Sequence, residues 1–184
     1  MMDGLSPGMS ISPFSEGEGM VAKDTSPNGF EANLQGDYKW VDQGKVGGAI
    51  ELTAGVAIVP GDDRLDVEQI TVMAWIFPTS ITPENTGEHW TGSNMIYDKS
   101  GNSDDSIALA LMEDDGAYLY INSGPGDKNR MGPFDGADVN NTLSLPDAGV
   151  QANQWQHIAG VFDGVNIQIY LNGELTGGNA HPWG

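Results

Sequence analysis

The chain has 184 residues, 39% of them hydrophobic, with 26 glycines and no cysteine. Its 26 Asp and Glu residues stand against 7 Lys and Arg residues, which gives a formal net charge of −19. The lack of cysteine excludes disulfides, zinc-thiolate sites and thiol catalysis. The charge disfavours nucleic acid and anionic lipid as partners and favours cations such as Ca²⁺, although adaptation to salty surroundings would also give an acidic surface.

The length predicts one domain over residues 1–184, with residues 1–9 flexible. No run of 18 apolar residues occurs, so no membrane insertion is expected. The opening residues "MMDGLSPGMS" lack the charged and apolar regions of a secretory signal. We therefore expect either a chain that begins after its signal or a piece of a larger protein.

Segments of strand composition, bounded by turn residues, follow one another along the chain, and none shows sustained helical spacing. The predicted strands are Ala49–Pro60, Gln69–Pro78, Ser106–Met112, Ala117–Asn122, Trp155–Phe162 and Asn166–Leu175, with weaker candidates at Ser10–Phe14 and Ser93–Lys99. This pattern predicts an all-β fold, a two-sheet antiparallel jelly-roll sandwich.

Turn chemistry predicts how some of these strands pair. "EDDG" (Glu113–Gly116), "DG" (Asp163–Gly164) and "NG" (Asn172–Gly173) each indicate a hairpin, because these residues tolerate positive φ. The stretch 123–153 is too long for a simple connection and is predicted to be a long loop or an insertion.

The hairpin "WQHIAGVFDG" (Trp155–Gly164) leaves two arrangements open. A two- or four-residue loop places Phe162 and Ile158 beside Ile167, with Trp155 and His157 on the opposite face of the sheet. A three-residue loop with a bulge reverses the two faces.

Several pieces, in this order, resemble the laminin-G-like, concanavalin A-like sandwiches of bacterial secreted proteins. They are "PFSEGEGMVAKDTSPNGFEANLQG" (Pro13–Gly36), "KWVDQGKVGGAIELT" (Lys39–Thr53), "ITVMAWIFPTSI" (Ile70–Ile81) and "NQWQHIAGVFDGVNIQIYLNGEL" (Asn153–Leu175). Members of that family usually continue with a closing strand, and this chain ends at "GGNAHPWG" without one. The resemblance therefore implies an open sheet edge, through truncation, domain swapping or strand donation.

The resemblance also implies a structural Ca²⁺ at "DTSPNG", held by the oxygens of Asp24 and Asn28. An Asx-type turn without an ion is an equal alternative, and the family's remaining carboxylate would come from the missing strand. A second acidic stretch, "DKSGNSDD" (Asp98–Asp105), lacks the glycine and glutamate of an EF-hand loop and is read as a solvated loop.

Catalysis is not expected. Glycoside hydrolysis needs a pair of carboxylates, and Glu113 and Asp115 lie in a turn signal where both would be exposed. In the related glucanases a third acid follows, and here Tyr118 takes its place. The three histidines come without a nucleophile elbow, so no triad is indicated.

Aromatic side chains that stack on sugar rings are the alternative to catalysis. Trp75 and Trp155 lie in strands and are predicted to be buried, whereas Trp90 lies in a polar loop, where it is either an exposed contact or a lid over the edge of the core. The candidate ligand-binding residues are therefore Trp90, His89, Asp98, Asn102 and Asn129.

The resemblance implies an extracellular or cell-surface module of a larger protein that recognises a polysaccharide or glycan without catalysis. Two other functions stay open: an adhesion or assembly module that binds protein partners or itself through the open edge, and a glycoside hydrolase.

Overall fold

The computed structural model describes residues 8–65, 67, 69–80, 94–100, 106–111, 116–123, 139–145 and 148–180. In these ranges the regular elements are β-strands and one short 3-10 helix, η1 (Asp63–Leu65). None of the helical structure in these ranges has the length and apolar character that crossing a membrane requires. The chain divides into two compact units, Met1–Asp66 and Val67–Gly184, and each is described by itself.

The first unit contains an antiparallel sheet of three strands in the order β1-β2-β3. The strands are β1 (Val21–Ala22), β2 (Ala32–Val41) and β3 (Ala49–Ile58). One face of the sheet buries Ala22, Ala32 and Leu34, and partly buried aromatic residues, among them Trp40, pack against them. The Nε1–H of Trp40 donates to the carbonyl oxygen of Gly19 at 2.9 Å, which fixes the chain ahead of β1.

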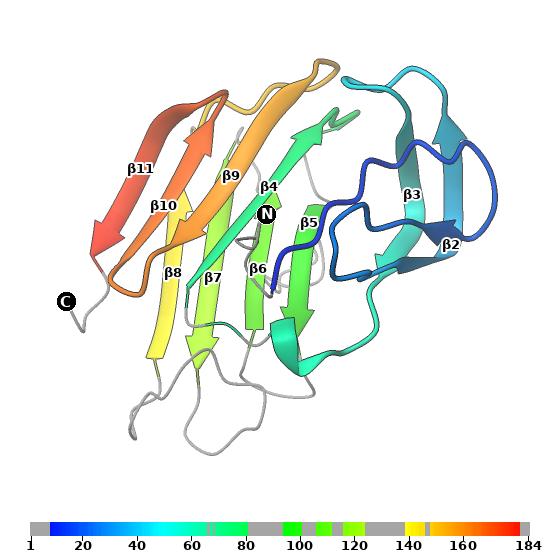
Figure 1. The fold of residues 1–184 in the computed structure, drawn as a ribbon. Helices are drawn as coiled ribbons and strands as arrows, with labels where there is room; N and C mark the ends of the chain where they lie inside the picture. The colour runs from blue at the N-terminus through cyan, green and yellow to red at the C-terminus, as the bar shows by residue number, and fades with distance from the viewer. Residues whose placement is uncertain are drawn as a thin grey trace, which may run out of the picture. The chain divides into compact units, whose positions relative to one another are not determined.

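The second unit contains two antiparallel sheets of four strands each, visible as two layers in Figure 1. One sheet has the order β11-β10-β9-β4, and the other has the order β5-β6-β7-β8. The strands of the first are β4 (Ile70–Ile76), β9 (Gln156–Phe162), β10 (Asn166–Leu171) and β11 (Glu174–Ala180). Those of the second are β5 (Asn94–Ser100), β6 (Ser106–Leu111), β7 (Ala117–Ser123) and β8 (Val139–Leu145).

The core of this unit lies between its two sheets. Side chains at alternate positions of β6, β7, β9 and β10 point inward, as the two-residue period of a strand requires. The buried cluster consists of Ile107, Leu109, Leu111, Ala117, Leu119, Ile121, Val150, Ile158, Phe162, Ile167, Ile169 and Leu171. The predicted all-β, antiparallel sandwich is therefore confirmed.

Most predicted strands are present with shifts of a few residues at their ends, including the weak candidate that became β5. Three differences stand out. Ser10–Phe14 is not a strand, because its backbone hydrogen bonds go to a turn: the Ile11 amide donates to Asp24, and the Ile11 carbonyl accepts from Thr25. β2 and β8 were not among the predicted strands, and their mixed polar sequences explain why.

One predicted boundary also changes. β8 lies inside the stretch 123–153, so part of the predicted loop or insertion belongs to a sheet. The carbonyl oxygen of Met9 accepts hydrogen bonds from Ser26 Oγ at 2.9 Å and Asn28 Nδ2 at 2.8 Å, and the flexibility of residues 1–9 stays a prediction.

The hairpins follow the turn chemistry. Asn172 and Gly173 both have positive φ, 52° and 85°, and Leu171 pairs with Glu174 across this two-residue turn. The Asp163–Gly164 turn has the longer form, in which Phe162 pairs with Ile167 across four intervening residues. β6 and β7 also pair as predicted, with Leu111 opposite Ala117.

Gly160 lets the two sheets of the second unit approach each other. A Cβ atom at this position would lie 3.0 Å from Leu119 Cδ1 and 3.2 Å from Leu109 Cδ1. A larger side chain would therefore push against buried leucines from the facing sheet.

We expect Gly160→Val to lower the free energy of unfolding by about 1–3 kcal/mol, the usual cost of overpacking a core. Urea denaturation would measure it. The matched control is Gly61→Val, because no heavy atom lies within 4 Å of a Cβ at Gly61. Equal unfolding midpoints for the two variants would contradict the close sheet contact.

Candidate functional site

The predicted ligand-binding residues are mostly beyond the described part of the chain. Trp90, His89, Asn102 and Asn129 lie outside the described residues. Asp98 is exposed on β5, where it pairs with Ala108 of β6. The structure thus tests neither the clustering of these five residues nor the exposure of Trp90, and the same holds for Glu113 and Asp115.

Asp24 organises the turn that was predicted to hold calcium. Its Oδ1 accepts hydrogen bonds from the amides of Ile11 and Ser26, each at 2.8 Å. Its Oδ2 accepts from Ser26 Oγ at 2.6 Å and from the amide of Phe30 at 2.8 Å. A single carboxylate therefore ties together two segments of chain that are about a dozen residues apart.

These contacts change the acidity of Asp24. Burial acts to raise the pKa of the carboxyl, but the hydrogen bonds from Ser26, Ile11 and Phe30 outweigh it and lower the pKa from 3.8 to about 2. The folded unit therefore holds this carboxylate in its ionised form more strongly than an unfolded chain does.

The arrangement does not fit a calcium ligand set. Ca²⁺ takes 6–8 oxygens, and both Asp24 oxygens already face N–H and O–H donors. The Asn28 amide nitrogen donates to Met9, and no group of three or more acidic or histidine side chains suited to a metal occurs in the described ranges. These contacts favour the turn without an ion, and calcium binding stays a prediction.

A different surface stands out in the second unit. We call it the aromatic face: the side of sheet β11-β10-β9-β4 that points away from the core. The register pairs Met73 with Ala159 and Trp75 with His157, while their neighbours Val72 and Ile158 point into the core. Its described side chains are Thr71, Met73, Trp75, Phe77, Trp155, His157, Ala159, Val161, Asn166, Gln168, Tyr170 and Leu175.

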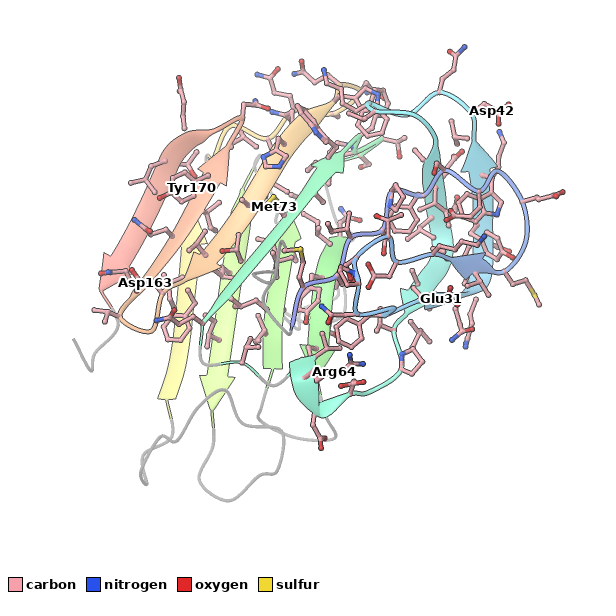
Figure 2. All side chains as sticks on the ribbon, viewed as in Figure 1. Glu31, Asp42, Arg64, Met73, Asp163 and Tyr170 are labelled. Atoms are coloured by element: carbon pink, nitrogen blue, oxygen red, sulfur yellow. The ribbon has the colours of Figure 1, made fainter. Side chains whose placement is uncertain are left out.

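Large apolar side chains of this face are open to solvent. The exposed fractions are 60% for Met73, 43% for Trp75, 44% for Phe77 and 54% for Leu175. Figure 2 labels Met73 and Tyr170, which lie over the side of the sheet turned to the viewer. Exposed apolar side chains gathered in one place usually mark a binding surface.

The rings of this face hold one another in place. Trp75 and His157 meet edge to face with centroids 5.2 Å apart, and Phe77 and Trp155 lie 5.5 Å apart. The two pairs follow one another along β4 and the start of β9, because the amide of Asn153 donates to the carbonyl of Pro78 at 2.7 Å. Ring pairs of this kind restrict side-chain motion before a ligand arrives.

The burial predicted from the sequence for the two tryptophans of this face differs from the structure. Trp75 was predicted to be buried, and the structure corrects this: it is 43% exposed, while Trp155 is half-buried. β4 is apolar at nearly every position, a pattern that usually indicates burial on both faces. For Trp155 and His157 the sequence left both hairpin arrangements open, and the four-residue loop of the structure turns these two side chains away from the isoleucines.

The comparisons with known proteins agree with this architecture. A family model described as the concanavalin A-like lectin/glucanases superfamily matches residues 47–184. A crystal structure of an S-layer domain-containing protein (residues 221–444) from Clostridium thermocellum ATCC 27405 is similar in fold, with a TM-score of 0.53 and 20% identity. That similarity covers 92% of this chain and 71% of the other. No curated protein matches significantly.

We expect Asp24→Ala to destabilise the first unit by about 1 kcal/mol at neutral pH, since four hydrogen bonds lose their acceptor while solvent reaches the site. The folded pKa is lowered, so this stabilisation is complete above pH 3.8 and is lost as pH falls toward 2. Denaturation at several pH values measures it, with exposed Asp37→Ala as control. A cost that does not shrink on acidification would contradict the assignment.

Melting temperatures with and without calcium test the predicted calcium site. From the hydrogen bonds of Asp24, we expect the melting temperature to be the same in EDTA and in millimolar Ca²⁺. A ligand that binds only the folded state must raise the melting temperature. A calcium-dependent rise that disappears in Asp24→Ala would establish the ion site instead.

Proposed function

The chain belongs to the concanavalin A-like lectin/glucanases superfamily, and from this premise we propose that it is a non-catalytic module that recognises a polysaccharide or glycan. The aromatic face is the binding surface. The observation that carries the proposal is the exposure of Trp75, a tryptophan in a paired strand that a folded domain would ordinarily bury.

The chemistry of this face suits sugars. The axial C–H groups of a pyranose ring form an apolar surface, which a flat indole or phenol ring covers well. Trp75 and Phe77 offer such rings on β4 and just past its end, and Tyr170 offers one on β10 of the same sheet. Covering Trp75 would remove from water an apolar surface that now costs free energy to expose.

Polar groups beside the rings would orient the ligand. Gln168 and Tyr170 lie on the same face, where the Tyr170 hydroxyl lies 3.4 Å from Gln168 Oε1. Half-buried amide and hydroxyl groups can exchange hydrogen bonds with sugar hydroxyls. The loop residues predicted from the sequence, Trp90 and its partners, stay candidates for further contacts.

We place the module in an extracellular or cell-surface protein. The superfamily membership supports this proposal, and so does the fold similarity to a protein named for its S-layer domain. A structural calcium ion is not needed for binding through the aromatic face.

An adhesion or assembly module is the second candidate. β11 is the last strand of its sheet within the described residues, and it carries the exposed Leu175. An edge strand with unpaired backbone groups can accept a strand from a partner or from a second copy.

We expect Trp75→Ala to weaken polysaccharide binding about tenfold, because a well-buried ring contact contributes between 1 and 2 kcal/mol. The affinity of Trp75→Phe should lie between that of Trp75→Ala and that of the unchanged protein. Affinity electrophoresis through gels that contain plant and marine polysaccharides would measure the order of affinities.

Val46→Ala is the matched control, since Val46 is 74% exposed but belongs to the first unit. If Trp75→Ala binds as well as the unchanged protein while Trp90→Ala does not, the site lies at the predicted loop and the aromatic face is the wrong surface. A monomer–dimer equilibrium without any polysaccharide binding would favour the assembly module.

A further inference from the structure

The aromatic face carries no Asp, Glu, Lys or Arg among its twelve described members, from Thr71 on β4 to Leu175 on β11. The acidic Asp163 lies beside the face in the β9–β10 turn, where its carboxylate accepts hydrogen bonds from the backbone and side-chain amides of Asn166. The lack of charged members is unusual in a chain with 26 acidic and 7 basic residues. From this we infer that the ligand is an uncharged polysaccharide, presented as a flat, extended array of sugar rings. The inference rests on the proposed function.

The charges of the protein argue against acidic polysaccharides as ligands. A uronate or sulfate group laid against this face would lose part of its hydration, with no lysine or arginine there to compensate. The net charge of −19 would also repel a polyanion during its approach. A neutral polysaccharide avoids both the loss of charge hydration and the electrostatic repulsion.

The shape of the face indicates how the sugar is presented. Met73, Trp75 and Phe77 form one row along β4 and its end, and consecutive members lie about 7 Å apart, since a strand rises about 3.3 Å per residue. The row from Thr71 to Phe77 is about 20 Å long by the same geometry. A row of this length spans several sugar units.

The face is a sheet surface instead of a pocket. Its side chains stand on neighbouring strands that lie about 4.8 Å apart, so the rings are spread in two dimensions. Two hollows of the described surface, with volumes of about 290 and 270 Å³, are lined by residues of the first unit. A broad apolar face matches the ring faces of packed chains better than it matches the end of a single chain.

The test compares ligands of different charge. The whole chain is mixed with insoluble cellulose and chitin, which are uncharged or nearly so, and the unbound fraction is measured after sedimentation. Alginate, pectate and dextran sulfate are tested as the anionic set by affinity electrophoresis. We expect binding to at least one insoluble neutral polysaccharide and none to the anionic set. The affinity should change less than about twofold when salt is raised, because screening has no charge pair to weaken.

Two charge variants at one position sharpen the test. Met73→Lys and Met73→Glu both place a charge at the centre of the row, and Met73 is 60% exposed, so folding should tolerate either change. With a neutral ligand, both variants should weaken binding to a similar extent, about threefold to tenfold, because each buries a charge without a partner. Val46→Lys serves as the charged control away from the face.

The outcomes distinguish the inference of a neutral, flat ligand from the proposal that the protein recognises a glycan. Binding to alginate or pectate that Met73→Lys strengthens and Met73→Glu weakens would overturn the inference and leave glycan recognition standing. Binding to a neutral oligosaccharide in solution but not to the insoluble polymer would overturn the flat array. No binding to any polysaccharide, together with a dimer that Met73→Lys dissociates in light scattering, would overturn both, and the face would then be a contact between two copies.

Discussion

The pairing of β4 with β9 decides which side chains of these two strands face the core. Because successive residues of a strand face opposite sides, a shift of one residue would exchange the buried and exposed sets completely. The observed register places Ile158 and Phe162 in the core with Val72 and Ile70. It therefore leaves Trp75 and His157 on the outside, and the candidate site exists only because of this register.

The same constraint acts through Gly160. This residue lies opposite Val72 in the register and lets Leu109 and Leu119 of the facing sheet come close. A tightly packed interior holds the sheet rigid, since cores pack as densely as organic crystals. The strands that carry the aromatic face thus pack on this core with their inward side chains, while Met73, Trp75 and Phe77 are exposed on the other side.

Charge is distributed unevenly over the chain. Two acidic residues of the first unit serve local structure: Asp24 closes a turn through four hydrogen bonds, and Asp62 binds Arg64, which lies over the Phe30 ring. Asp163 has a similar role in the β9–β10 turn, where it accepts hydrogen bonds from the amides of Val165 and Asn166. These three carboxylates bind backbone amides or a neighbouring side chain, and none of them is a member of the aromatic face.

The sequence alone determined the all-β class, most strands, the Asn172–Gly173 turn and the family resemblance, because each rests on local composition and spacing. It anticipated Asp24 as the centre of a turn, which the hydrogen bonds show, while calcium binding there stays a prediction. Only the tertiary structure decided which face of β4 and β9 is exposed. An apolar strand reads the same whether one or both of its faces are covered, and only the partner sheet, brought near by long-range packing, separates the buried Ile158 from the exposed Trp75.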